Sequence, residues 1–507
     1  MSSITSRILP QTEGMGGRVF VIFLLFLLGL FLFARMGTMG LAAIVVIPVA
    51  ILLMYVSYKF SMLGFWGLFI TNYFIMGLGR YFYIPVQITL IMELFEVLVL
   101  ISILLDYKNI RASYLGNTMG LMLGIWIVYL IIQIFNETCS LPFSMGEWFI
   151  KFNQLALNLY IVYAITTLSV NTPERISKFL KLWAVLSLLA VFWAWRQKTF
   201  GFDDAEKIWL AQGGASTHII AGAIRYFSFY SDAANFGCSI GAAATAFMVL
   251  ALTAKTKFDK IFYGVTFLAC VYGLFASGTR AALFVFIVGV SIYIVLSKSI
   301  KIAIPVLTAG TIFICILAFT DIGNNNNMIR RMRTAFDPND PSKGVRDVNK
   351  EALRKYMRDA PFGLGISMDP FKIPANNKYK IVSQTASDSS YVYLWEYTGI
   401  VGEVLFALVN VIILFGGSWI VMFRIKNKAL CGIGAAFCCA FGAINVGGYV
   451  NNILTQYPNL ILYYGGMAIC YVLPRIEKDY QLYEDQVMAK IEEQKRIKEE
   501  KKLASRV

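Results

Sequence analysis

Histidine is almost absent from this sequence, and charged residues are scarce. Of its 507 residues one is a histidine, His218, and 15% are charged. Soluble domains usually carry about 25% charged residues, so this composition does not suit a surface that faces water on every side. With a single histidine, the chain cannot use any mechanism that needs two histidines. We expect His218 to be a hydrogen-bonded structural residue rather than a catalytic base.

The cysteines give no sign of a metal site. Six of the eight lie inside apolar runs, where cysteine behaves as a small hydrophobic residue. Cys438 and Cys439 are adjacent, so they do not easily share one tetrahedral metal centre. No cysteine spacing in the chain predicts a zinc site.

Long apolar runs are what the sequence has in abundance. Hydrophobic residues make up 58% of the chain, and its mean hydropathy is +0.64. Runs of roughly 20 residues, the length that crosses a bilayer, recur about fourteen times. They lie at roughly 18–35, 40–57, 62–79, 87–105, 117–135, 148–170, 180–197, 236–254, 261–277, 281–297, 302–320, 392–422, 431–449 and 457–473. The sequence therefore predicts an all-α, polytopic membrane protein with about fourteen transmembrane helices.

The basic residues between these runs predict how the chain is oriented. If the N-terminus lies inside, every basic cluster falls in a cytoplasmic connection, as positive-inside retention requires. These clusters include Lys255, Lys257 and Lys260, and later Arg424, Lys426 and Lys428. The net charge of +15 is explained in this way, and a nucleic-acid partner is not expected. We predict a multi-pass protein of the bacterial inner membrane with both termini in the cytoplasm.

This topology divides the chain into four parts. Residues 1–320 hold the first eleven helices and an outer segment at about 200–235, and residues 321–391 form a large periplasmic loop. Residues 392–474 hold the last three helices, and 475–507 form a charged cytoplasmic tail that we expect to be a solvated helix. Within the large loop, Val348 to Asp359 is typical of a short amphipathic helix.

Basic residues on the outer side of the membrane are unexpected. The large loop carries twelve lysines and arginines against eight acidic residues, and Arg225 and Arg280 lie near outer helix ends. A guanidinium group close to lipid needs an anion or a water-filled cavity, and its geometry matches phosphate oxygens. Several such arginines together suggest a phosphorylated lipid headgroup. For Arg35 and Arg80 we favour simple extension of the side chain toward the interface.

Four segments in this order carry a family resemblance. They are RYFSFYSDAANFG from Arg225, SGTRAALFVFIVG from Ser277, GVRDVNKEALRKYMRDAPFGLG from Gly344, and SDSSYVYLWEYTGIVG from Ser387. Together they resemble landmarks of the O-antigen ligase and polymerase superfamily, between residues 225 and 402. The resemblance implies transfer of a glycan from a polyprenyl diphosphate carrier to a hydroxyl group on the periplasmic side, without a metal or other cofactor.

The resemblance also implies roles for particular residues. Arg225 and Arg280 would grip the diphosphate, with Arg346 as a third contact, because preorganised cations stabilise a departing anion. Asp232 and Asn235 would shape the sugar end of the site. Further candidates for substrate contact are Tyr391, Arg330 and Arg331.

The chain departs from the ligase pattern at one position. Where that branch has a histidine proposed to activate the acceptor hydroxyl, this sequence has Asp388. An aspartate can accept the proton, although its ordinary pKa of about 3.9 makes it a weak base unless it is desolvated. The alternative role is that of N-cap for the following helix. The two roles can coexist, and both stay open.

Several functions remain open at this point. Because the ligase histidine is missing, polymerisation of surface-polysaccharide repeat units is the favoured hypothesis. Its partners would be a glycan acceptor and a chain-length regulator. Ligation to a lipid A core, or to a protein hydroxyl, is the close alternative. Intramembrane carboxylates at Glu93 and Glu96 keep a third alternative open, a transporter of lipid-linked sugars or polysaccharide.

Overall fold

A computed structural model describes residues 61–82, 88–105, 111–220, 223–333, 341–385 and 389–504, together with Tyr55, Lys59 and Ser387. The first two predicted spans, at 18–35 and 40–57, lie outside the described residues. From residue 61 onward, each predicted apolar run corresponds to a helical segment. The long apolar helices are α3 (Ser61–Tyr81), α4 (Ile88–Leu105), α5 (Thr118–Ile132), α8 (Pro173–Phe200), α11 (Ala233–Thr253), α12 (Lys257–Ala276), α13 (Arg280–Ser297), α18 (Ser390–Trp419) and α19 (Lys428–Val450). A further apolar helix, α14 (Ile300–Phe319), follows α13.

Several spans are composite. A π-helical turn, η5 (Asn153–Leu157), joins α6 (Met145–Phe152) to α7 (Asn158–Ser169). Similar turns extend other spans: η4 (Gln133–Phe135) follows α5, η9 (Ile420–Arg424) follows α18, and η10 (Leu460–Tyr464) and η11 (Leu473–Arg475) flank α20 (Gly465–Val472). Among the described residues, nine helices are long and apolar enough to cross a membrane. The predicted all-α, polytopic architecture is confirmed.

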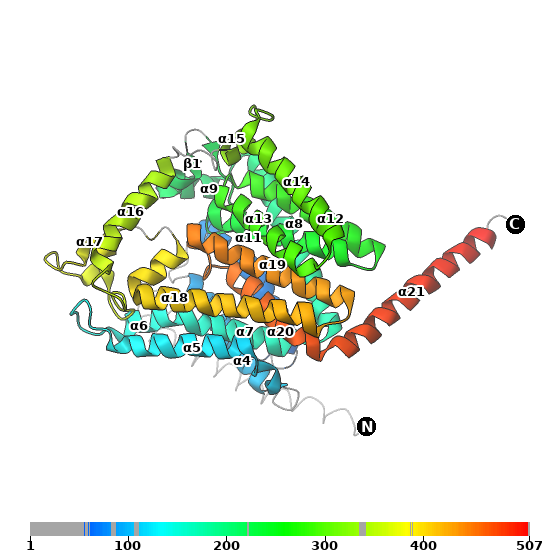
Figure 1. Ribbon diagram of the computed structural model, residues 1–507, viewed down its shortest axis with the longest axis horizontal. Helices are drawn as coiled ribbons and strands as arrows, with labels where there is room; N and C mark the ends of the chain where they lie inside the picture. The colour runs from blue at the N-terminus through cyan, green and yellow to red at the C-terminus, as the bar shows by residue number, and fades with distance from the viewer. Residues whose placement is uncertain are drawn as a thin grey trace, which may run out of the picture.

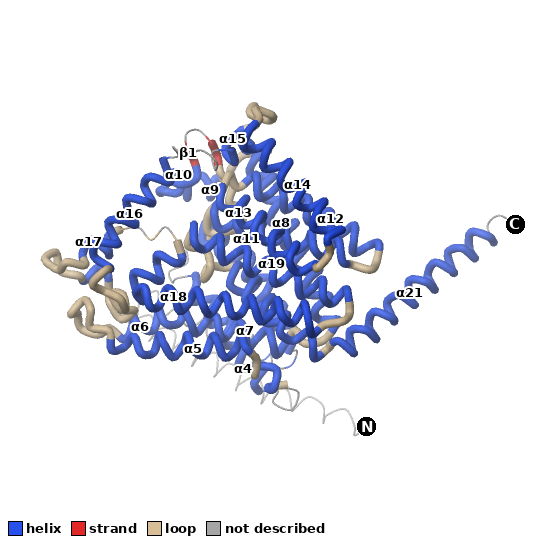
Figure 2. Tube along the Cα trace, viewed as in Figure 1, coloured by secondary structure: helices blue, strands red, loops and turns tan. Residues whose placement is uncertain are grey.

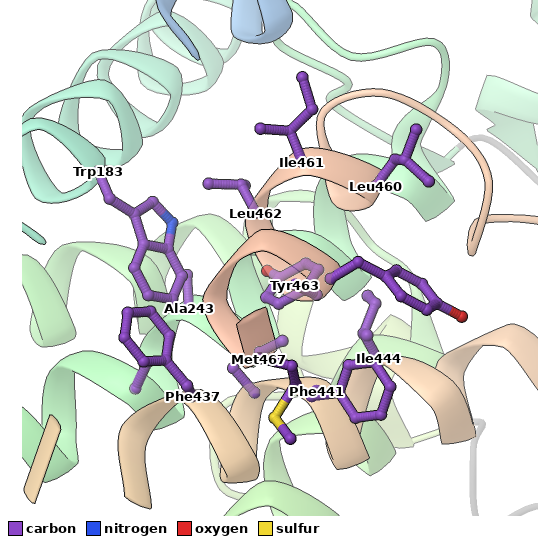
Figure 3. Packing of buried hydrophobic residues seen from close by; sticks show 14 of the residues in the cluster. Trp183, Ala243, Phe437, Phe441, Ile444, Leu460, Ile461, Leu462, Tyr463 and Met467 are labelled. Carbon is purple, nitrogen blue, oxygen red and sulfur yellow. The ribbon is translucent and has the colours of Figure 1, made fainter. Parts of the chain in front are cut away.

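The centre of the bundle is formed by α11 and α19. Of the most apolar window in each, 78% and 83% of the residues are buried, whereas most other spans expose half or more of theirs. Both helices are rich in glycine and alanine, and small side chains let helix backbones approach closely where lipid offers no hydrophobic driving force. Aromatic residues of neighbouring helices fill the remaining space: Trp183 stacks on Phe437 with ring centroids 6.2 Å apart (Figure 3).

The two ends of the bundle differ. One end, here called the basic end, gathers the lysine-rich connections and η3 (Ala112–Leu115). The tail helix α21 (Glu477–Ala504) starts there, where Glu484 pairs with Lys255 at 2.5 Å, and its distal half extends away from the bundle (Figure 1). The tail is thus helical, as predicted.

The opposite end, here called the loop end, carries the long connections (Figure 2). It contains the described two-stranded hairpin of β1 (Ile219–Ile220) and β2 (Ala223–Ile224). Its other elements are α9 (Asp204–Trp209), η6 (Leu210–Gly214), α10 (Ala215–His218), α15 (Asn327–Arg333), α16 (Pro341–Met357), η8 (Pro370–Lys372) and α17 (Lys380–Gln384). The helix predicted at Val348 to Asp359 is α16, which begins seven residues earlier.

Candidate functional site

Arg225 lies where the β-hairpin leads back toward the bundle. The antiparallel pairing of Ile219 with Ile224 is extended by the Arg225 N–H, which donates to the His218 carbonyl at 2.9 Å. The half-buried side chain is held from two sides: Nη1 donates to the Thr217 carbonyl at 2.8 Å and Nη2 to Thr279 Oγ1 at 2.8 Å. Its Nε is buried and has no hydrogen-bond partner among the described residues. The side chain is therefore fixed without all of its donors being used.

A tight turn between α12 and α13 passes directly beside Arg225. Gly278 in this turn has φ of 57°, a left-handed conformation that favours glycine. A Cβ atom at Gly278 would lie 3.1 Å from Arg225 Cγ and 3.8 Å from Arg331 Cγ. The next helix begins two residues later with Arg280. The turn thus brings together three arginines that are far apart in sequence.

The electrostatics of Arg225 reflect this convergence. Burial, and then the positive charges of Arg331 and Arg280, lower the pKa of Arg225 to about 10, against the opposing effect of Asp232. The guanidinium group is still protonated at neutral pH. Cations gathered in a partly desolvated place form an anion site, because a multiply charged anion relieves their mutual repulsion.

A cavity of about 490 Å³ adjoins the arginines, a size typical of ligand sites. Its lining is polar and cationic at the side of α15, where Arg331 contributes together with the asparagines at 325–327. Lys198, at the end of α8, and Tyr226 also line the cavity. Lys198 Nζ lies 3.0 Å from the Met328 sulfur. Arg330 is exposed and donates to Asn327 Oδ1 at 2.8 Å, so of the predicted pair it is Arg331 that lines the cavity.

Asp232 and Asn235 occupy structural positions at the start of α11. Asp232 Oδ1 accepts hydrogen bonds from the backbone N–H groups of residues 234 and 235, which makes it the N-cap. Asn235 is fully buried, and its amide bonds Ser231, Asn459 and the Tyr457 carbonyl. Asp232 still acts on the site through its charge, whereas the amide of Asn235 is turned into the bundle.

Two of the sequence motifs interlock at the loop end. Helix α18 is interrupted at Gly399, whose φ is 69°, and Gly363 of the loop has φ of 76°. A side chain at either glycine would overlap the backbone of the other segment. The backbones pair: Leu364 N–H donates to the Glu396 carbonyl at 2.8 Å, and Val401 N–H to the Pro361 carbonyl at 3.2 Å. The large loop is therefore fastened to the N-terminal part of α18, at the loop end.

Of the remaining predicted site residues, Tyr391 and Arg346 belong to described helices and Asp388 does not. Asp388 falls outside the described residues, and the N-cap of α18 is Ser389, whose hydroxyl accepts from Val392 N–H at 3.0 Å. The prediction of Asp388 as the cap is therefore wrong: the helix begins one residue later. Tyr391 lies in the first turn of α18, and its hydroxyl group is 3.4 Å from Asn445 Oδ1. Arg346 lies on α16, and its side chain is not among those described.

Sequence reasoning missed three residues of the site. Thr279 accepts a hydrogen bond from Arg225 and in turn donates one to the Ala233 carbonyl at 2.9 Å. Thr217 contributes its backbone carbonyl, a group that every residue has, so the sequence gives no sign of this role. Glu396 is 5% exposed and accepts a hydrogen bond from Ser387, on the side of α18 that faces the loop. Of these three, only Glu396 had a sequence signal, since it is one of two acidic residues in an apolar span.

The fold and this site define a class of protein. The chain is a multi-pass helical membrane protein with a cavity beside a cluster of arginines at one end of its bundle. Residues 265–407 match the family described as O-antigen ligase, a stretch that runs from within α12 to α18 and contains the Gly278 turn. The match confirms the resemblance to the O-antigen ligase and polymerase superfamily and supports a membrane glycosyltransferase of that type. A search of curated proteins gave no match.

Proposed function

We propose that this protein transfers a glycan from a polyprenyl (undecaprenyl) diphosphate carrier to a hydroxyl acceptor on the periplasmic side of the inner membrane. Polymerisation of O-antigen or other surface-polysaccharide repeat units is the reaction we favour, since the ligase histidine is replaced by Asp388. The observation that carries the proposal is the convergence of Arg225, Arg280 and Arg331 on Gly278, beside a cavity of about 490 Å³.

The chemistry needs such a cluster. When the acceptor oxygen attacks the anomeric carbon, the bond to the diphosphate breaks and the carrier leaves with an additional negative charge. Arginines that are already in place stabilise this charge without reorganising, and donors of this kind typically contribute about 10²–10³-fold in rate. Arg225 is held by Thr217 and Thr279, so its position does not depend on the substrate.

The acceptor side is assigned to the junction between the large loop and α18. In this proposal Asp388 removes the proton from the acceptor hydroxyl, and Tyr391 and Arg346 contact the substrate. The interlocked backbones of the loop and α18 favour this place, because they hold a polar segment rigidly at the loop end. The reaction needs no metal.

A direct test uses purified protein in detergent with a polyprenyl-diphosphate-linked repeat unit. A polymerase lengthens the glycan on the carrier, whereas a ligase leaves it unchanged until a lipid A core or protein acceptor is added. A transporter changes nothing in detergent, where there is no second compartment. Absence of any transfer with all acceptors would contradict the proposal.

The cellular test is the glycan profile of a deletion strain. Surface caps of a single repeat unit support polymerisation, and free polymer that accumulates on its carrier supports ligation instead. Reporter fusions check the sidedness: one after Val507 should report cytoplasm, and one between residues 339 and 375 should report periplasm. A cytoplasmic large loop would overturn the mechanism.

Contacts of Glu96 in the bundle interior weaken the transporter alternative. Glu96 is fully buried and accepts a hydrogen bond from Tyr457 at 3.0 Å, and Tyr457 also receives one from Asn158 at 2.9 Å. These contacts tie α4 and α7 to the segment before η10. Packing between helices explains the hydrogen-bonded oxygen of Glu96 without an ion path, whereas Oε2 is buried without a hydrogen-bond partner among the described residues.

A further inference from the structure

The one histidine of the chain lies beside the arginine site. His218 ends the short helix α10 and is 2% exposed. Its ring packs edge-on against Trp209 and Phe227, with centroids 5.0 Å and 5.1 Å away. Nothing in the proposed reaction uses His218, so its burial beside Arg225 calls for a separate explanation.

The hydrogen bonds of His218 fix its protonation state. The Ala233 N–H donates to Nε2 over 3.1 Å, so Nε2 must carry a lone pair. The single ring proton is then on Nδ1, which lies 2.8 Å from the Gly214 carbonyl oxygen and donates to it. Only the neutral imidazole with its proton on Nδ1 satisfies both contacts.

These contacts belong to a closed ring around Arg225. The His218 carbonyl accepts from the Arg225 N–H at 2.9 Å, and the side chain of His218 holds the N–H of Ala233. On the other side, Thr279 accepts from Arg225 Nη2 at 2.8 Å and donates to the Ala233 carbonyl at 2.9 Å. Backbone and guanidinium group of Arg225 are thus both anchored to one residue in the first turn of α11.

We propose that His218 is a positioning residue for Arg225, and that its neutral imidazole is what locks the arginine onto the start of α11. The inference rests on the proposed function, in which Arg225 grips the diphosphate. When His218 is protonated, a second N–H points at the Ala233 N–H, the bond is lost, and the hairpin that carries Arg225 is released from α11. Donor binding therefore weakens at acid pH.

The charges around the ring set the pH range of this effect. Burial lowers the pKa of His218 below its ordinary value of 6.5, and the cations Arg225 and Arg80 act in the same direction. Asp232, at the start of α11, acts in the opposite direction, as does the bond to the Gly214 carbonyl. The lock is therefore complete above pH 6.5, and it opens as the pH falls through the lowered pKa.

The experiment measures binding of farnesyl diphosphate to the full-length protein in detergent by isothermal titration calorimetry, between about pH 5.5 and about pH 8. His218→Phe fills the space without an acceptor, and His218→Gln keeps an uncharged acceptor that does not titrate in this range. Ser216→Ala is the matched control, since Ser216 lies in the same short helix but bonds only the Gly213 carbonyl. The diphosphate itself titrates, but equally for all variants.

We expect wild type and Ser216→Ala to lose more affinity on acidification than His218→Gln loses, by up to about tenfold at about pH 5.5, because one proton is taken up with a pKa below 6.5. His218→Phe should be weakened about tenfold already at neutral pH. Identical pH profiles for wild type and His218→Gln would overturn the inference. If His218→Phe does not fold, the comparison of wild type with His218→Gln is enough to decide. Undiminished binding by Arg225→Ala would instead overturn the proposed function, whatever the His218 variants do.

Discussion

Two half-buried arginines at the loop end show how different the tasks of one residue type can be. Arg80, in the last turn of α3, donates to three backbone carbonyls in the segment 228–231. Its guanidinium carbon lies 4.3 Å from the ring centroid of Phe227 and 4.6 Å from that of Trp209. The guanidinium group of Arg80 thus bonds the protein's own backbone and holds the loop that precedes α11. Simple extension toward the interface, our interpretation of Arg80 from the sequence, does not describe these contacts.

Arg225 is the contrasting case. Two of its nitrogens are anchored, Nε is left buried without a partner among the described residues, and other arginines stand beside it. An arginine that only stabilises the fold is surrounded by acceptors, whereas one prepared for an anion is held in place beside further cations. The comparison predicts that the two residues fail in different ways when they are replaced.

The largest effect is expected at Asp388, which tests whether the arginines act alone. Asp388→Asn should reduce turnover by about 10²–10⁴-fold, the usual contribution of a general base. Because Ser389 caps α18, neither Asp388→Asn nor Asp388→Ala should lower thermal stability. Ser389→Ala is the control: it should destabilise the protein by about 1 kcal/mol and leave turnover per folded molecule unchanged. If Asp388→Asn turns over like wild type, Asp388 is not the general base and catalysis depends on the arginines.

Next come the arginines of the site. Arg225→Ala and Arg280→Lys should each lower turnover by about 10²–10³-fold with an unchanged melting temperature. Lysine keeps the charge of Arg280 but loses the two-pronged geometry that fits phosphate. Arg354→Ala, an exposed arginine on α16, is the control and should behave like wild type. If cells complemented with Arg280→Ala make near-normal glycan, Arg280 does not belong to the site.

Arg80→Met should show the reverse pattern. It leaves three carbonyls without their donor and should reduce the free energy of unfolding by about 3 kcal/mol. Turnover, corrected for the folded fraction in a fluorescence-detected melting experiment, should stay close to wild type. A variant that folds normally but has lost its turnover would place Arg80 in the site beside Arg225.

The smallest effect is expected at Gly278, where the turn touches Arg225. Gly278→Ala introduces a left-handed alanine at a cost of roughly 1 kcal/mol and a Cβ atom 3.1 Å from Arg225 Cγ. We expect about a tenfold loss in kcat/KM, since small displacements of positioned groups slow a reaction. Gly310→Ala, in α14 with no atom within 4 Å of the new Cβ, should have no effect.

Prediction from the sequence succeeded where one local property decides the outcome. The apolar runs from residue 61 onward became helices, because a chain in lipid must satisfy its backbone internally. It failed at the cap of α18, where aspartate and serine are equally suited by type and only the backbone shows that Ser389 fills the position. Asp232, predicted to face the sugar, caps α11, and its role toward a substrate stays a prediction.

The sequence by itself determined the class of this protein, since composition and run length suffice to place helices in a membrane, and motif order suffices for a family resemblance. Only the tertiary structure decided which polar residues serve the site. Thr279 and His218 lie 54 and seven residues from Arg225 in the chain, yet both bond Arg225 and both bond Ala233, through hydrogen bonds of about 3 Å. Such bonds depend on how separate segments pack, and no local pattern of residues encodes that geometry.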